Sequence, residues 1–65
     1  MKTNVSVLIT AMADNGYTAR RLAPAANVST MTIARMLTGA RVRPDTYKKI
    51  ADALNVRPSD LIVFD

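Results

Sequence analysis

The chain of 65 residues is 49% hydrophobic, carries a net charge of +4 and contains neither cysteine nor histidine. This composition excludes disulfides, thiolate metal sites and histidine-based acid–base chemistry, and a chain of this length buries only about 60% of the surface that it exposes when unfolded. We therefore expect one domain over residues 1–65 with no metal, no cofactor and no enzymatic activity, stabilised further by oligomerisation.

The first predicted helix begins after Thr3 or Asn4, both good N-cap residues, and ends at Asn15-Gly16. Its apolar residues follow the spacing of one helix face: Val5, Leu8, Ile9 and Met12. The same segment faintly resembles a signal peptide, but Ser6 and Thr10 interrupt the apolar run. No run approaches the roughly 18 residues of a membrane span, so we expect no membrane association.

The second predicted helix begins at the N-cap residue Thr18 and directs Leu22 and Ala23 inward. Pro24 lies inside this helix, where proline removes a backbone hydrogen bond at a cost of about 3 kcal/mol. We expect the helix to kink or to stop early there. Asn27 then makes the turn, because asparagine tolerates the left-handed backbone region better than most residues.

Ser29 is the predicted N-cap of a third helix, which Gly39 ends. At about 100° per residue, its apolar residues cluster on one side: Ile33, Met36 and Leu37. The opposite face carries three other side chains: Met31, Arg35 and Thr38. This short helix is therefore amphipathic, with an arginine facing away from the expected core.

A basic loop over residues 40–43 leads to a fourth predicted helix, which Asp45 caps and Asn55 ends. Its inner stripe has four members: Tyr47, Ile50, Ala51 and Leu54. Pro58 opens a short last turn, after which residues 62–64 form at most a stub of strand. Together these segments predict an all-α, compact five-helix domain.

Positive charge is concentrated in the middle of the chain. No acidic residue occurs between Asp14 and Asp45, so that window carries a charge of +5 and the rest of the chain sums to −1. The positive residues of the window are Arg20, Arg21, Arg35, Arg41 and Arg43. Such one-sided charge is typical of a phosphate-binding surface, and a solvated face that only keeps the protein in solution is the alternative interpretation.

The second helix, the turn and the third helix predict a helix-turn-helix over about residues 18–38. The segment L-A-P-A-A-N-V-S-T-M-T-I-A-R-M-L-T-G resembles that of phage repressor and Cro proteins, the xenobiotic-response-element family, and the resemblance covers nearly the whole chain. The third helix is also similar to lactose-repressor-type headpieces, which lack the leading helix. The first resemblance implies a lambda-repressor-like fold and sequence-specific binding to double-stranded DNA.

The chain departs from the family pattern at two positions that commonly hold an arginine and a glutamate paired across the core. They are Met12 and Leu37 here, so we expect an apolar contact in place of the ion pair. The frequent glutamine at the start of the second helix is Ala19, and the neighbouring Arg20 and Arg21 are candidates to replace its phosphate contact.

The resemblance places DNA-facing side chains at the start and middle of the third helix. We predict base contacts at Thr30, Met31 and Arg35. Arg35 is interpreted as bidentate to guanine O6 and N7, with a phosphate contact as the alternative, whereas Met31 either touches a thymine methyl group or folds back over the core. Phosphate or mixed contacts are predicted at Thr18, Arg20, Arg21, Ser29, Thr38, Arg41 and Arg43. Lys48 and Lys49 are assigned to a solvated face.

We therefore predict a cytoplasmic, nucleoid-associated transcriptional regulator of bacterial or phage origin, a phage-type repressor or Cro-like protein. One such module buries only about 600–1,000 Å² on DNA, so we expect a homodimer on a pseudo-palindromic operator with half-site centres about 34 Å apart. The candidate dimer patch is Ile62, Val63 and Phe64, with ordinary core closure as its alternative. The alternative function is a protein-binding module, such as an antitoxin or an adaptor, whose basic face meets an acidic partner.

Overall fold

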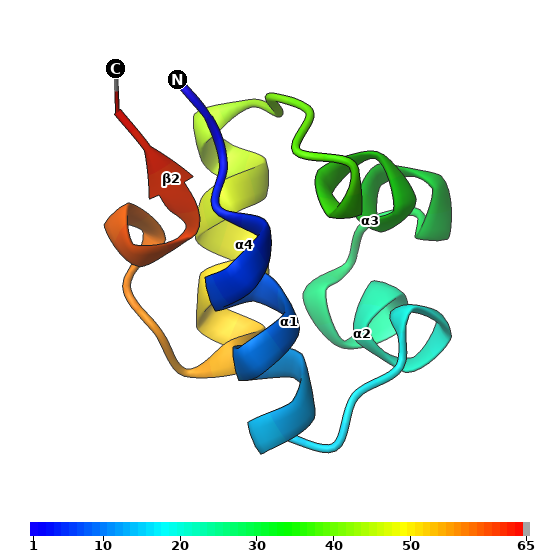
Figure 1. Cartoon of the computed structure of the whole chain (residues 1–65). Helices are drawn as coiled ribbons and strands as arrows, with labels where there is room; N and C mark the ends of the chain where they lie inside the picture. The colour runs from blue at the N-terminus through cyan, green and yellow to red at the C-terminus, as the bar shows by residue number, and fades with distance from the viewer. Residues whose placement is uncertain (65) are drawn as a thin grey trace.

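Residues 2–3 and residues 62–63 lie side by side at one end of a group of short helices (Figure 1). The computed structural model describes residues 1–64. Its elements, in chain order, are β1 (Lys2–Thr3), α1 (Val5–Asp14), α2 (Ala19–Ala26), α3 (Thr30–Leu37), α4 (Pro44–Leu54), the 3-10 helix η1 (Pro58–Leu61) and β2 (Ile62–Val63). Helix α2 packs on α3 and α4, while α1 packs on α3 and η1.

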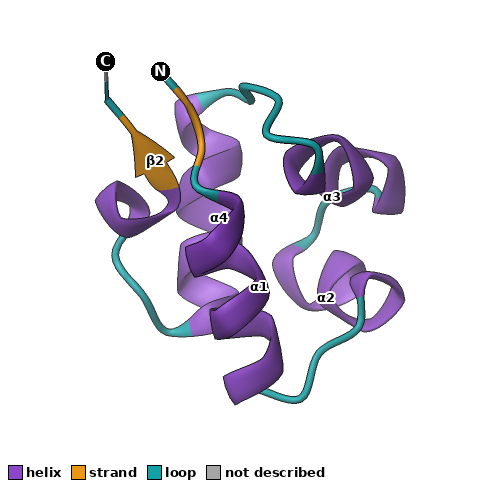
Figure 2. Ribbon diagram, in the orientation of Figure 1, coloured by secondary structure: helices purple, strands orange, loops and turns teal. Residues whose placement is uncertain are grey.

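The prediction of an all-α, five-helix domain is confirmed only in part. Residues 1–64 form four α-helices, the fifth predicted helix is a single 3-10 segment, and β1 pairs antiparallel with β2 (Figure 2). In this pairing Lys2 lies opposite Val63 and Thr3 opposite Ile62. Two-residue strands carry no periodicity that a sequence pattern can reveal, which explains the omission of β1. Residue 65 of the predicted domain lies outside the described residues.

Three side-chain caps fix where the first three helices begin. Asn4 Oδ1 accepts from the backbone N–H of Val7 at 3.3 Å, and Thr18 Oγ1 accepts from that of Arg21, also at 3.3 Å. Ser29 Oγ accepts from the N–H of Thr32 at 3.1 Å. Each cap satisfies a donor that the first helical turn leaves without an intrahelical partner, so the predicted starts are confirmed.

The predicted cap of α4 is wrong. Arg43 is its N-cap without a side-chain cap bond, Pro44 occupies the first turn, and Asp45 lies inside the helix. Proline suits this position because it has no N–H to satisfy and its φ is already helical. Asp45 instead places its negative charge in the first turn, where the helix dipole favours it.

Of the two expectations for Pro24, the one in which helix α2 stops early is wrong. The helix continues to Ala26, and Asn27 follows as its C-cap in the left-handed region with φ of 58°. Pro24 is exposed and lacks the N–H that would bond to the carbonyl of Arg20 one turn earlier, yet the helix runs two residues beyond it. The N–H of Val28 then donates to the carbonyl of Ala23 at 3.0 Å and closes the turn.

The core gathers residues from every helix around the inner stripe of α4. Its members are Leu8, Ala11, Met12, Leu22, Ala23, Ala26, Ile33, Met36, Tyr47, Ile50, Ala51, Leu54 and Leu61. Ile9 is 54% exposed, so its predicted place on the inner face of α1 is wrong. Contact with α3 and η1 rotates the buried stripe of α1 toward Ala11 and the half-buried Val7. Met12 is buried, and Leu37 is half-buried against the same core.

None of the helices within residues 1–64 has the length and apolar character that crossing a membrane requires. These residues contain no group of three or more acidic, histidine or cysteine side chains placed to hold a metal ion.

The left-handed turn gives a stability prediction. Asn27→Ala should lower the free energy of unfolding by about 1 kcal/mol, because a Cβ disfavours positive φ, whereas Asn27→Gly should leave it within about 0.5 kcal/mol. The exposed helical residue Ala25 is the control, because Ala25→Gly should lower the free energy of unfolding by about 1 kcal/mol. Glycine should therefore be more stabilising than alanine at position 27, and alanine more stabilising than glycine at position 25. Urea unfolding measures all three, and equal losses for both Asn27 variants would contradict the assigned turn.

Candidate nucleic-acid interface

The orientation of α3 follows from its two fully buried side chains. Ile33 and Met36 are both 0% exposed, so the opposite side of the helix faces outward. That side presents the three predicted base-contact residues, Thr30, Met31 and Arg35, all of them exposed. Met31 is 70% exposed, and the alternative in which it folds back over the core is wrong. The outward face of α3 therefore matches the surface predicted to approach base edges.

Hydroxyl groups at the two ends of α3 differ in what they can still donate. Ser29 Oγ and Thr32 Oγ1 lie 2.9 Å apart and share one hydrogen bond, so one of their two protons stays available to an acceptor such as phosphate. Thr38 Oγ1 donates its single proton to the carbonyl of Arg35 at 2.7 Å. Thr38 therefore serves mainly to end the helix, and a phosphate contact from it requires breaking this bond.

A basic cleft lies where α3, the following loop and the start of α4 meet. It has a volume of about 450 Å³ and is lined by Thr32, Arg35, Arg41, Val42, Arg43, Pro44 and Thr46. The cleft thus brings together three of the five arginines in the positive window. The N-terminus of α4 lies at the same place, and its dipole attracts anions, with Asp45 already placing one negative charge in the first turn.

The arginines of the positive window have no acidic partner within residues 1–64. The ion pairs recorded there join Lys48 to Asp52 at 3.0 Å and Arg57 to Asp60 at 3.7 Å. The pairing of Lys48 agrees with its assignment to a solvated face. A cluster of cations that the protein itself does not neutralise is suited to an external anion.

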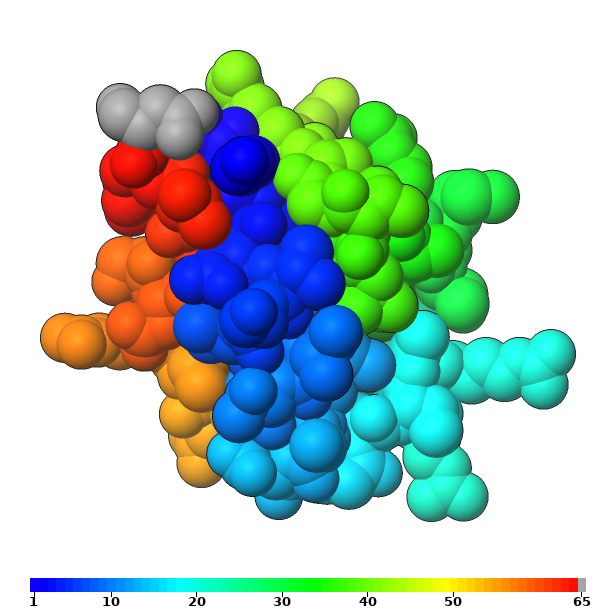
Figure 3. Space-filling view, in the orientation of Figure 1, coloured from blue at the N-terminus to red at the C-terminus, as the bar shows by residue number. Residues whose placement is uncertain are grey.

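Thr18, Arg20 and Arg21 lie apart from the cleft, at the start of α2. All three are exposed, and the hydroxyl of Thr18 caps the helix. Helix α2 packs on α3, so this second set of charges lies on a helix that neighbours α3. In Figure 3, long side chains of α2 (cyan) and α3 (green) project at the same edge of the molecule.

Four residues that line the cleft were not among the predicted contacts, and two of them, Thr32 and Thr46, carry hydroxyl groups. Thr46 lies in the first turn of α4, and no feature of its local sequence distinguishes it from an ordinary helical threonine. Thr32 was not predicted as a contact, although its position three residues before Arg35 on one helix places both on neighbouring turns. That spacing was the signal that could have identified it.

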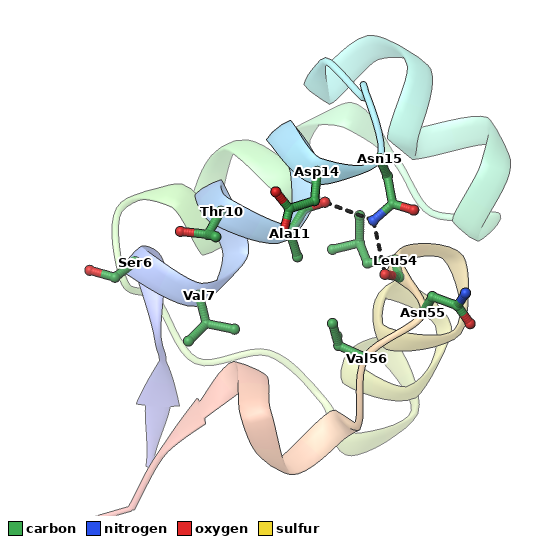
Figure 4. Close-up of a pocket in the computed structure, with 9 residues that line it drawn as sticks. All are labelled: Ser6, Val7, Thr10, Ala11, Asp14, Asn15, Leu54, Asn55 and Val56. Carbon is green, nitrogen blue, oxygen red and sulfur yellow. Dashed lines mark hydrogen bonds between the residues drawn. The ribbon is translucent and has the colours of Figure 1, made fainter.

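A second hollow lies between α1 and the end of α4 and differs in character (Figure 4). Its volume is about 460 Å³, and the only ionisable residue in its lining among residues 1–64 is Asp14. Asn15 Nδ2 spans its rim, donating to the carbonyls of Ala11 at 2.8 Å and Leu54 at 2.9 Å. A hollow with one acid and no base does not suit a phosphate, so the basic cleft is the candidate anion site.

Comparison with known proteins shows which family the sequence resembles. The sequence pattern of the family described as "Cro/C1-type HTH DNA-binding domain" matches residues 7–65. Comparison with curated proteins found no match. A solved structure of a mutant hydroxyethylphosphonate dioxygenase is similar, with 28% sequence identity and a TM-score of 0.83 over 98% of this chain. The match spans 14% of the length of that dioxygenase chain.

The geometry of α3 makes a specific prediction for Arg35. Arg35→Ala should cost about 1–3 kcal/mol on the preferred duplex site and relax the preference at one base pair, because a bidentate guanine contact is lost. Lys49→Ala is the matched control, since it removes the same charge from the exposed surface of α4 outside the cleft. Binding to cognate and random duplexes measures the effect, and equal losses on both would show that Arg35 contacts only phosphate.

Proposed function

The chain belongs to the family of Cro/C1-type helix-turn-helix DNA-binding domains, and we propose that it is a sequence-specific transcriptional repressor of the phage or Cro type. The observation that carries this proposal is the cleft beside α3, where Arg35, Arg41 and Arg43 gather without a carboxylate partner among residues 1–64. Family membership makes the chain a DNA-binding regulator, whereas repression and operator type are the proposed additions.

The proposed complex places α3 in the major groove. The groove is about 12 Å wide, which matches the roughly 10–12 Å diameter of a helix with its side chains. Thr30, Met31 and Arg35 then face base edges. In this arrangement Arg35 pairs with guanine O6 and N7, and the exposed thioether of Met31 contacts a thymine methyl group.

Phosphate contacts flank the base contacts on two sides of α3. Arg41 and Arg43 grip one backbone from the cleft, together with the N-terminus of α4. Arg20 and Arg21 approach the other side from the start of α2. Phosphate contacts of this kind fix the register of the protein on the duplex without themselves reading sequence.

A protein-binding module, such as an antitoxin or an adaptor, is the competing function. The same fold is part of a dioxygenase chain, and a fold by itself does not specify a function. Salt dependence together with sequence preference separates the two functions. A steep loss of DNA affinity with rising salt and a preferred site support the repressor, whereas tight binding to an acidic protein without any DNA shift supports the module.

We also propose that the protein binds DNA as a homodimer. Among the predicted patch residues, Ile62 packs against the core and Val63 is half-buried, whereas Phe64 is 66% exposed. The outer side of β1 is occupied, because the N–H of Thr3 donates to the carbonyl of Gly39 at 3.4 Å. On β2 the N–H of Ile62 already donates to the carbonyl of Ser59, so we assign the dimer contact to the exposed side chain of Phe64, which a second copy can cover across a two-fold axis.

The dimer proposal predicts a defect for Phe64→Asp. Burying a carboxylate at the two-fold contact is unfavourable, so the variant should sediment as a monomer at concentrations where the wild type dimerises. Ile9→Asp is the control, because Ile9 is 54% exposed on α1, an element outside the sheet, and should leave the oligomeric state unchanged. A wild type that stays monomeric both at high concentration and on DNA would contradict the dimer.

Selection of bound sites from random duplex DNA tests the proposed function. A phage-type or Cro-like repressor should enrich a pseudo-palindrome whose half-site centres lie about 34 Å apart, one helical turn of DNA. Arg35→Ala, selected in parallel, should lose one base preference in each half-site. Enrichment of no sequence by the wild type would contradict a sequence-specific regulator.

A further inference from the structure

The N-terminal strand contacts the loop that carries the basic cleft, although the two lie far apart in the sequence. Thr3 is only 3% exposed and is the buried polar residue of the core. Its backbone N–H donates to Gly39, and its hydroxyl reaches the carbonyl of Ala40 at 2.7 Å. In Figure 1 the blue N-terminal strand accordingly lies at the end of the molecule where the loop between α3 and α4 passes.

The direction of these hydrogen bonds follows from counting protons. The hydroxyl of Thr3 has one proton, and it is donated to the carbonyl of Ala40. The bond of 2.9 Å between Thr3 Oγ1 and the hydroxyl of Tyr47 must then have Tyr47 as the donor. Tyr47 is 0% exposed, so its hydroxyl needs this buried acceptor. The chain Tyr47–Thr3–Ala40 thus links α4, β1 and the loop.

Few other bonds hold the loop at this point. The N–H of Ala40 donates to the carbonyl of Arg35 at 3.2 Å, and the carbonyl of Arg43 accepts from the first turn of α4. Between these two anchors lies the peptide that joins Ala40 to Arg41. Within residues 1–64, the polar contact recorded for that peptide is the hydroxyl of Thr3.

We propose that Thr3 is a positioning residue for DNA binding, since it holds the loop so that Arg41 and Arg43 stand in the cleft. Thr3 itself touches no DNA, because it is buried beneath the loop. Without the bond to Ala40, the loop occupies its binding conformation for only part of the time, and the apparent affinity falls by that fraction. This inference rests on the proposed function, in which these two arginines bind phosphates.

Four variants of the full chain test the inference. Thr3→Val keeps the shape of the side chain but removes its hydroxyl, whereas Thr3→Ser keeps the hydroxyl. Asn15→Ala is the matched control, because it removes two hydrogen bonds at the other end of α4 and leaves the loop untouched. Arg41→Ala tests the phosphate contact itself. The probes are the selected duplex and a random duplex, each titrated over a range of salt.

Thr3→Val should bind both duplexes about threefold to tenfold more weakly, with the slope of log K against log salt smaller by up to about 1. Thr3→Ser and Asn15→Ala should bind within about twofold of the wild type. In the free protein, hydrogen exchange at the amide of Ala40 should be faster in Thr3→Val and unchanged in Asn15→Ala. If Thr3→Val does not fold, Thr3→Cys replaces the hydroxyl with a weaker S–H donor and should show the same changes to a smaller extent.

Wild-type affinity in folded Thr3→Val, or an equal loss in Asn15→Ala, would overturn the inference. The failure of the proposed function has a different signature. In that case Arg41→Ala binds DNA like the wild type, and the proposed role of Thr3 in DNA binding is wrong as well. Hydrogen exchange at Ala40 would still report whether the hydrogen bond from Thr3 holds the loop.

Discussion

Burial of Ile33 and Met36 in the core determines how α3 is oriented and therefore which surface it offers to DNA. Both side chains are completely buried, and they lie three residues apart on a helix of only eight residues. Once this pair is fixed in the core, the helical repeat sets which residues of α3 face outward. The outward position of Arg35 is therefore a consequence of apolar packing on the opposite side.

Most of the helical architecture could be predicted from the sequence, because local chemistry determines it. Ser29 and Thr18 cap their helices as expected, and Asn27 adopts the left-handed turn. Features that depend on distant segments escaped prediction: Thr3 is buried by contacts with Ala40 and Tyr47, which no local pattern reveals.

The candidate site shows the same division. Arg35 was identifiable because it lies opposite an apolar stripe on one helix. The cleft was not, because it joins α3 to the start of α4 and depends on where Asp45 and Pro44 lie in that helix. No local sequence pattern determines the backbone path of the loop between α3 and α4. Thr3 donates a hydrogen bond to the carbonyl of Ala40 in that loop. A residue outside the positive window therefore helps to position the arginines inside it.

In the proposed complex α3 enters the major groove with Arg35 at a guanine. Dimethyl sulfate probing of the selected duplex detects this arrangement, because the reagent methylates guanine N7 in the major groove and adenine N3 in the minor groove. The wild type should protect one guanine N7 in each half-site, and Arg35→Ala should leave this guanine reactive. Protection confined to adenine N3, or guanine protection unchanged in Arg35→Ala, would contradict this arrangement.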